Sequence, residues 1–284
     1  MWSGVVKLLQ MIRFEHSVFA LPFAVAAALY ATRGEVLWRP FGWILLAMVT
    51  ARTAAMAFNR ISDLRFDALN PRTRDRHLPS GAIPYWQAAT LVGVSSGLFV
   101  LAAGMLNKTC LIASGPLLLY LLGYSFSKRF TWLSHLYLGT TLGLSPVGVW
   151  VGLTETVEAF PLYLGAAITL WVAGFDVIYA CLDEAFDREI RLHSIPARFG
   201  IRAALVVSAL CHAATAGTLL ALGLQFGLGW LYWSLLVPIL LVLAYEHWMV
   251  RPDDLGRVNV AFFNANAVFS VALMAALVAD LLSV

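Results

Sequence analysis

Residues 160–187 read FPLYLGAAITLWVAGFDVIYACLDEAFD, an apolar run that ends in closely spaced acidic side chains. A bilayer core about 30 Å thick requires roughly 20 consecutive apolar residues per helix. The part from 160 to 182 meets this requirement with a single charged residue, Asp176. This stretch therefore predicts a transmembrane helix that carries carboxylates at its carboxyl end.

The rest of the chain has the same character. Of its 284 residues, 61% are hydrophobic and 12% are charged, which is about half the charged fraction of a soluble domain. We expect an all-α integral membrane protein with nine transmembrane helices, near 14–32, 41–59, 84–106, 109–126, 132–153, 160–182, 201–223, 229–250 and 259–282. No stretch between them is long enough for a separate soluble domain, so residues 1–284 are expected to form a single transmembrane domain.

The distribution of cations predicts the orientation. With nine spans, all but three of the 19 Lys and Arg residues fall on one side, the three being Arg33, Arg39 and Lys108. Positive residues favour the cytoplasmic side. The N-terminus and the even-to-odd loops are therefore expected to be cytoplasmic, in the inner (cytoplasmic) membrane. The net charge of +3 is then a signal of topology and does not indicate a nucleic-acid partner.

Two acidic clusters lie at the predicted cytoplasmic face. Asn59, Asp63 and Asp67 are spaced i, i+4, i+8, which places them on one face of a helix. In the second cluster Asp183 and Asp187 are spaced i, i+4. Tyr179 and Asp176 lie one and two turns back from Asp183 on roughly the same face.

Carboxylates at this spacing repel one another, and near hydrocarbon each costs several kcal/mol. A cation between them would offset both penalties. Clusters that offer oxygen without His or Cys suit a hard cation such as Mg²⁺, which is commonly held by one or two carboxylates and substrate phosphates. The two clusters together therefore predict Mg²⁺ ions that bridge to a diphosphate. The three cysteines, Cys110, Cys181 and Cys211, have neither disulfide nor zinc-site spacing.

Cationic side chains in two of the predicted cytoplasmic loops could neutralise a departing diphosphate. Residues 70–81 read NPRTRDRHLPSG and include Arg72, Arg74 and Arg76, and the predicted 4–5 loop contains Lys128 and Arg129. Positive-inside topology alone is an alternative explanation for these residues. Arg13 lies where the first predicted span enters the membrane, so a local salt bridge there is as plausible as a ligand contact.

With these motifs, nearly the whole chain resembles the UbiA superfamily of intramembrane aromatic prenyltransferases, and most of all its 4-hydroxybenzoate polyprenyltransferase-like branch. The matching motifs are Asn59…Asp63…Asp67, Asn70-Pro71-Arg72-Thr73, Leu78-Pro79-Ser80-Gly81, Tyr124…Lys128-Arg129, Asp176…Tyr179…Asp183…Asp187 and Ser194-Ile195-Pro196-Ala197-Arg198-Phe199-Gly200. Asp75 and His77 depart from the family, which often has Gly and Pro around the intervening arginine.

The resemblance implies a central cavity, open to the cytoplasmic side and to lipid, in which Mg²⁺ ions bridge the two motifs to a polyprenyl diphosphate. Diphosphate departs, a small aromatic acid acceptor attacks the allylic cation, and a base removes the ring proton. The expected metal ligands are Asp63, Asp67, Asp183 and Asp187. The expected catalytic residues are Asp63, Asp176, Tyr179 and Asp183. The expected substrate-binding residues are Asn59, Arg76, Lys128, Arg129 and Arg13, with Arg129 a candidate for the acceptor carboxylate.

Three alternatives stay open. A dihydroxynaphthoate, as in menaquinone biosynthesis, would use the same diphosphate site, so an acceptor panel must separate it from 4-hydroxybenzoate of ubiquinone biosynthesis. Intramembrane carboxylates also mark ion pathways in transporters, but the sequence has no evident inverted repeat and its acids gather at one face. A structural membrane scaffold leaves the paired carboxylates unexplained.

Overall fold

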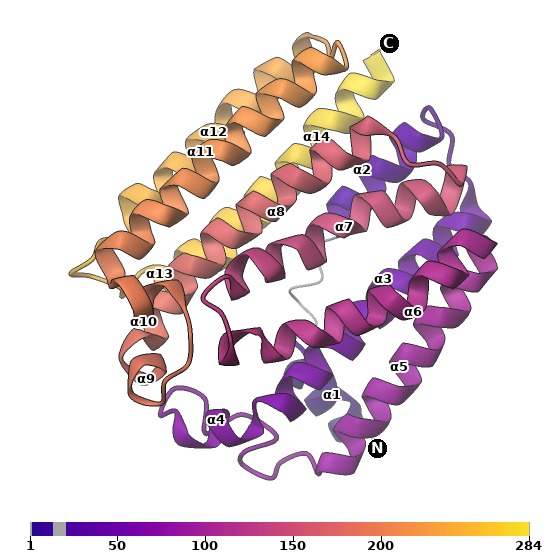
Figure 1. The fold of residues 1–284 in the computed structure, drawn as a ribbon. Helices are drawn as coiled ribbons and strands as arrows, with labels where there is room; N and C mark the ends of the chain where they lie inside the picture. Colours follow the sequence, from indigo (N-terminus) through magenta and orange to yellow (C-terminus); the bar gives the residue numbers. More distant parts are fainter. Residues whose placement is uncertain (1, 14–20, 284) are drawn as a thin grey trace. The chain divides into compact units, whose positions relative to one another are not determined.

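The computed structural model describes residues 2–13 and 21–283, and within them the regular elements are helices without a β-strand (Figure 1). This confirms the all-α class. Eight described segments are long and apolar enough to cross a membrane: Trp38–Ser62, Tyr85–Leu106, Lys108–Arg129, Ser134–Thr154, Ala159–Glu189, Ile201–Gln225, Trp230–Met249 and Phe263–Ser283. The first predicted span, 14–32, lies partly outside the described residues. Its described part contains α2 (Leu21–Ala31), an apolar helix shorter than these eight.

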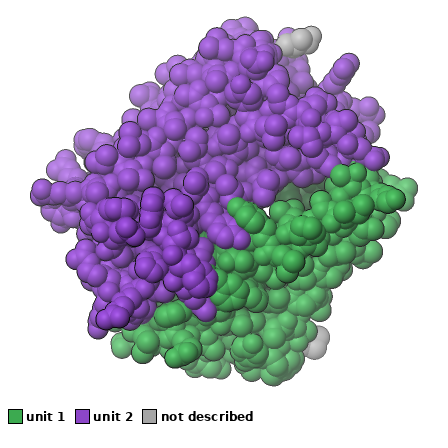
Figure 2. Space-filling view, in the orientation of Figure 1, with its two compact units in different colours: residues 1–17, 38–126 green, residues 18–37, 127–284 purple. Residues whose placement is uncertain are grey.

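The chain divides into two compact units, coloured separately in Figure 2. Unit 1 comprises residues 1–17 and 38–126, and unit 2 comprises residues 18–37 and 127–284. The helices of unit 1 are α1 (Trp2–Met11), α3 (Trp38–Ser62), α4 (Leu64–Leu69), α5 (Tyr85–Leu106) and α6 (Lys108–Gly123). Those of unit 2 are α2, α7 (Ser134–Thr154), α8 (Ala159–Ala180), α9 (Glu184–Glu189), α10 (Ile195–Phe199), α11 (Ile201–Gln225), α12 (Trp230–Met249), α13 (Val258–Val260) and α14 (Asn266–Ser283).

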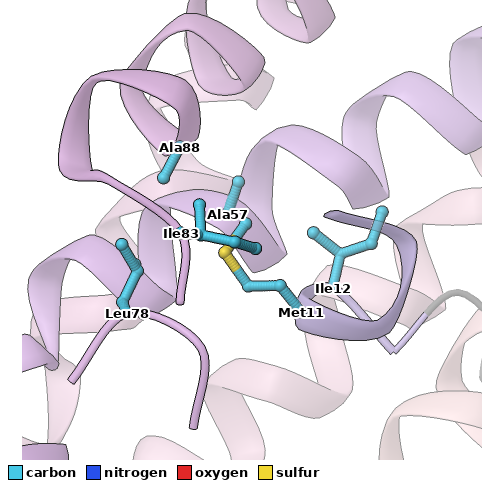
Figure 3. Packing of buried hydrophobic residues seen from close by; sticks show 6 residues of the cluster. All are labelled: Met11, Ile12, Ala57, Leu78, Ile83 and Ala88. Carbon is cyan, nitrogen blue, oxygen red and sulfur yellow. The ribbon is translucent and has the colours of Figure 1, made fainter. Parts of the chain in front are cut away.

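A small apolar core in unit 1 holds the loop that follows the first acidic cluster. Helix α3 packs along α5, and both contact α6. Around the cytoplasmic end predicted for α3, Met11, Ala57 and Ala88 come together with two loop residues, Leu78 and Ile83 (Figure 3). Because Leu78 and Ile83 are buried, the loop between α4 and α5 is anchored at two points. This anchoring gives Arg76 a defined position.

Helix α8 is the central element of unit 2. It packs against α7 and α11, while α14 packs against α12 and α2. Leu164, Trp171 and Val172 of α8 are fully buried. The Trp171 ring stacks on Phe269 of α14 with 4.6 Å between ring centroids. The residues that α8 carries near its carboxyl end are therefore held by a rigid, enclosed helix.

Three glycines allow α7 and α8 to approach closely. A Cβ atom added at Gly139 or Gly143 of α7 would collide with the backbone of Thr169 or Gly165 on α8. A Cβ added at Gly165 would likewise collide with the carbonyl oxygen of Gly143. Small residues at four-residue spacing are typical of tight helix packing in membranes. The contact places the start of α7 beside the carboxyl half of α8.

Candidate functional site

The first acidic cluster lies where α3 gives way to α4. Helix α3 ends at Ser62, and Asp63 occupies the N-cap position of α4. The backbone N–H of Asp63 still donates to the carbonyl of Asn59 over 2.9 Å, and that of Asp67 to the carbonyl of Asp63 over 2.8 Å. The helical spacing expected from the sequence therefore survives the change of helix. The Asn59 side-chain amide donates to Asp63 Oδ2 over 2.8 Å.

Asp67 is paired with Arg76. A single guanidinium nitrogen, Nη1, lies 2.8 Å from Oδ1 and 2.9 Å from Oδ2 of Asp67. Arg60 is buried, and its Nη1 lies 4.0 Å from Asp67 Oδ2. The Arg60 Nε donates to the Met11 carbonyl. A residue expected to bind metal is thus joined to one expected to contact diphosphate. Sequence reasoning did not assign Arg60 a role, because it was counted only as a topology signal.

His77, one of the two departures from the family pattern, adds no positive charge beside Arg76 at neutral pH. Burial lowers the pKa of the His77 imidazole, and the charges of Lys7, Arg13 and Arg60 lower it further. The cationic character of this loop near Asp67 therefore comes from arginine.

The second acidic cluster is held at the carboxyl end of α8. After α8 ends at Ala180, a 3₁₀ turn spans Cys181–Asp183 and α9 begins with Asp183 at its N-cap. The Asp187 side chain is buried, with the residue only 3% exposed, and the Ser194 side chain hydrogen-bonds to it. The Lys128 Nζ lies 3.9 Å from Asp187 Oδ2, and that oxygen accepts no hydrogen bond from a described residue.

Asp176 has a partner that sequence reasoning missed. The buried His135, near the start of α7, has its Nδ1 2.7 Å from Asp176 Oδ2. Its Nε2 accepts the backbone N–H of Ile195 over 3.3 Å. The signal available in the sequence was only a lone histidine shortly after Lys128 and Arg129, which does not indicate its partner.

The remaining predicted residues are less closely tied to a cluster. Tyr179 is half-buried and packs against a small apolar core of Ile178, Val250 and Val258. Arg129 is half-buried beside Lys128 in a 3₁₀ turn, Tyr124–Arg129. Arg13 is exposed, and its carbonyl accepts from the Arg52 guanidinium over 3.3 Å. Glu15 and His16, which follow Arg13 closely in the sequence, lie outside the described residues.

The donors of both clusters suit Mg²⁺ better than a transition metal. Within the described residues, no group of three His, Cys, Asp or Glu side chains is arranged to hold a metal ion. A site for Mg²⁺ does not require one, because this ion is usually bound by one or two carboxylates together with substrate phosphates and water. The buried Asp187 oxygen without a hydrogen-bond donor is the kind of atom that a cation would satisfy.

Residues 20–269 match the model of the UbiA prenyltransferase family. The chain belongs to the UbiA prenyltransferase family. The resemblance seen in the motifs is thereby confirmed, and the chain is a multi-span membrane prenyltransferase.

Relatives and solved structures agree with this assignment. A protein of Vibrio campbellii named 4-hydroxybenzoate octaprenyltransferase is 29% identical over 277 residues, which cover 96% of each chain. The apo structure of a UbiA homologue from Aeropyrum pernix K1 matches with a TM-score of 0.85 and 35% identity, over 94% of this chain and 98% of that one. A UbiA homologue from Archaeoglobus fulgidus, bound to DMAPP and Mg²⁺, shares the fold with a TM-score of 0.68 and 17% identity, over 95% of this chain and 99% of that one.

Proposed function

We propose that this protein transfers a polyprenyl group from a polyprenyl diphosphate to a small aromatic acid, with 4-hydroxybenzoate as the acceptor. The observation that carries the proposal is the buried Asp187 carboxylate, whose Oδ2 accepts no hydrogen bond from a described residue and lies 3.9 Å from the Lys128 ammonium. A buried carboxylate oxygen that accepts no hydrogen bond from a described residue is suited to a metal–diphosphate. The name of the Vibrio campbellii relative supports the choice of acceptor.

Each acidic cluster has cations of its own for the departing diphosphate. In unit 1, Asp63 and Asp67 would hold Mg²⁺, with Asn59 fixing the Asp63 carboxylate and Arg76 able to turn from Asp67 to a phosphate oxygen. In unit 2, Asp183 and Asp187 would hold Mg²⁺ and Lys128 would contact the diphosphate. Bound Mg²⁺ would neutralise the charge that develops on the leaving diphosphate.

The remaining candidates act on the acceptor side of the reaction. Asp176 and Tyr179 would line the reacting region on α8, and Arg129 would bind the carboxylate of the aromatic acid. Arg13 would contact substrate at the entrance. The apolar helices would exclude water, which would otherwise quench an allylic cation.

We also propose that the loops carrying both clusters face the cytoplasm, with the protein in the inner membrane. The excess of Lys and Arg in these loops supports this orientation. Labelling of single cysteines introduced at Arg65 and at Arg39, in inside-out and right-side-out vesicles, tests it. Labelling of the Arg65 position from the outside would overturn the orientation.

An acceptor panel tests the function. Purified protein in lipid, with Mg²⁺ and geranyl diphosphate, is offered 4-hydroxybenzoate and two dihydroxynaphthoates separately, and products are identified by mass. Prenylated 4-hydroxybenzoate is the expected product. A prenylated naphthoate alone would overturn the choice of acceptor and point to Asp75 and His77 as the first residues to exchange. No product with any acceptor or prenyl chain length would overturn the prenyl transfer itself.

A further inference from the structure

We infer that His135 is a positioning residue that fixes the orientation of Asp176, an inference that rests on the function proposed above. The two side chains come from different helices, α7 and α8, within unit 2. Their contact is short, 2.7 Å from His135 Nδ1 to Asp176 Oδ2. His135 is only 1% exposed and the Asp176 side chain 16%, so the histidine is enclosed and the carboxylate remains partly open.

The backbone of Ile195 determines which nitrogen of His135 carries the proton. Its N–H donates to His135 Nε2 over 3.3 Å, so Nε2 must present a lone pair. In a neutral imidazole the proton then lies on Nδ1. Nδ1–H then donates to Asp176 Oδ2, which accepts. An imidazolium would place two N–H donors against each other at Nε2.

The Ile195 amide is itself held in place. Ile195 begins α10, and the Ser194 side chain caps this helix by accepting the Ala197 N–H over 3.3 Å. Ser194 also hydrogen-bonds to Asp187. One residue earlier, the His193 N–H donates to the Lys128 carbonyl over 2.7 Å. The turn at 193–195 thus ties together Lys128, Asp187 and, through His135, Asp176.

This arrangement gives His135 a defined task. Without a partner, a carboxylate near the end of an apolar helix would be free to rotate about its side-chain bonds. The Nδ1–H of His135 holds one oxygen, Oδ2, in place. With Oδ2 held, the orientation of the whole carboxylate is fixed. His135 never needs to contact substrate, so its loss should lower kcat and leave diphosphate binding almost unchanged.

Two substitutions at His135 separate this role from packing. His135→Leu removes both the donor and the acceptor, whereas His135→Gln supplies a neutral amide with one of each. We expect His135→Leu to lower kcat about 10–100-fold, the usual loss when a supporting hydrogen bond is removed, with the KM for geranyl diphosphate unchanged. His135→Gln should restore most of kcat. Leu136→Ala, at the exposed neighbouring position on α7, is the matched control and should behave as wild type.

A spectroscopic measurement tests the pair without turnover. In ¹⁵N spectra of histidine-labelled protein, the signals that vanish in His135→Gln belong to His135. They should show a protonated Nδ1 and a bare Nε2 at neutral pH. Asp176→Asn should preserve this tautomer, because an amide oxygen still accepts from Nδ1, while kcat falls with the lost charge.

Several results would overturn the inference. One is a proton on Nε2, or on both nitrogens, in the wild-type protein. Others are a normal kcat in His135→Leu, or an equal loss of kcat in His135→Leu and His135→Gln, each with unchanged melting temperature. If the wild-type protein transfers no prenyl group to any acceptor, the proposed function fails and with it the catalytic use of the pair, whereas the ¹⁵N spectra still decide whether the pair exists.

Discussion

Arg76 and Asp67 form an ion pair in which one guanidinium nitrogen contacts both carboxylate oxygens, at 2.8 and 2.9 Å. Without a metal ion, the charge of Asp67 is thus balanced from within the loop between α4 and α5. A metal ion and the arginine would compete for the same two oxygens. Arg76 then has two roles to separate, one as the partner of Asp67 and one as a ligand of diphosphate.

Replacing Arg76 should separate these roles. In Arg76→Ala we expect a higher KM for geranyl diphosphate, because a phosphate contact is lost, and a lower Mg²⁺ concentration at half-maximal rate, because Asp67 is released. The unpaired carboxylate should cost about 1–3 kcal/mol of folding stability. Steady-state kinetics with varied Mg²⁺ and thermal melting measure these changes. Arg65→Ala removes an exposed arginine on α4 and should change none of them, and an unchanged KM in Arg76→Ala would refute the diphosphate contact.

The four aspartates expected to bind Mg²⁺ should each be essential. In Asp63→Ala, Asp67→Ala, Asp183→Ala and Asp187→Ala we expect kcat to fall at least about 100-fold, since each removes an electrostatic contact needed in the transition state. Glu189→Ala, at an exposed carboxylate on α9, is the matched control. Near wild-type turnover at saturating Mg²⁺ in any of the four would remove that residue from the set of metal ligands.

Chelation should stop the reaction and leave the fold intact. The helices are stabilised by packing, so EDTA should abolish turnover with little change in melting temperature, and Mg²⁺ should restore it. Geranyl diphosphate together with Mg²⁺ should raise the melting temperature, because ligands that bind the folded state stabilise it. In Asp187→Asn this rise should be absent. A full rise in that variant would show that Asp187 does not take part in binding.

Packing between α7 and α8 should tolerate no added methyl group at Gly143. A Cβ there meets the backbone of Gly165, so Gly143→Ala should destabilise the protein by about 1–3 kcal/mol and lower turnover, because α7 carries His135. Gly148 on the same helix has open space around its Cβ position. Gly148→Ala should be neutral or stabilising, since alanine favours helix. Thermal melting in matched detergent compares the two, and equal effects would contradict the close approach.

We expect the native Glu246 side chain to lower the folding stability of the protein. The residue is 1% exposed on α12, and neither carboxylate oxygen accepts a hydrogen bond from a described residue. The nearest cationic candidate, His212 Nδ1, lies 3.7 Å away and is already 2.9 Å from His247 Nε2. A buried polar group without hydrogen-bond partners costs about 1–3 kcal/mol, so Glu246→Leu should raise the melting temperature. A lower melting temperature would show that the His212–Glu246 pair is net stabilising.

Much of the architecture could be predicted because its causes are local in sequence. The apolar runs predicted helices that the structure contains, since a span needs only length and hydrophobicity. The i, i+4 spacing of Asp63 and Asp67 persisted across the junction of α3 and α4. However, the sequence did not indicate that α3 ends at Ser62 and α4 begins after Asp63, because Ser62 and Asp63 carry no strong helix-stop signal.

The composition and the apolar runs by themselves determined that this chain is an α-helical membrane protein, and its motifs gave the resemblance to the UbiA family. Only the tertiary structure decided which groups support the acids. His135 lies 41 positions from Asp176 and 60 from Ile195. The His135 and Asp176 side chains meet because glycines let α7 approach α8. The Ile195 backbone N–H reaches His135 because α10 begins at Ile195. Such pairs depend on the register of packed helices, which is set by the fit of whole surfaces, so no local pattern predicts them.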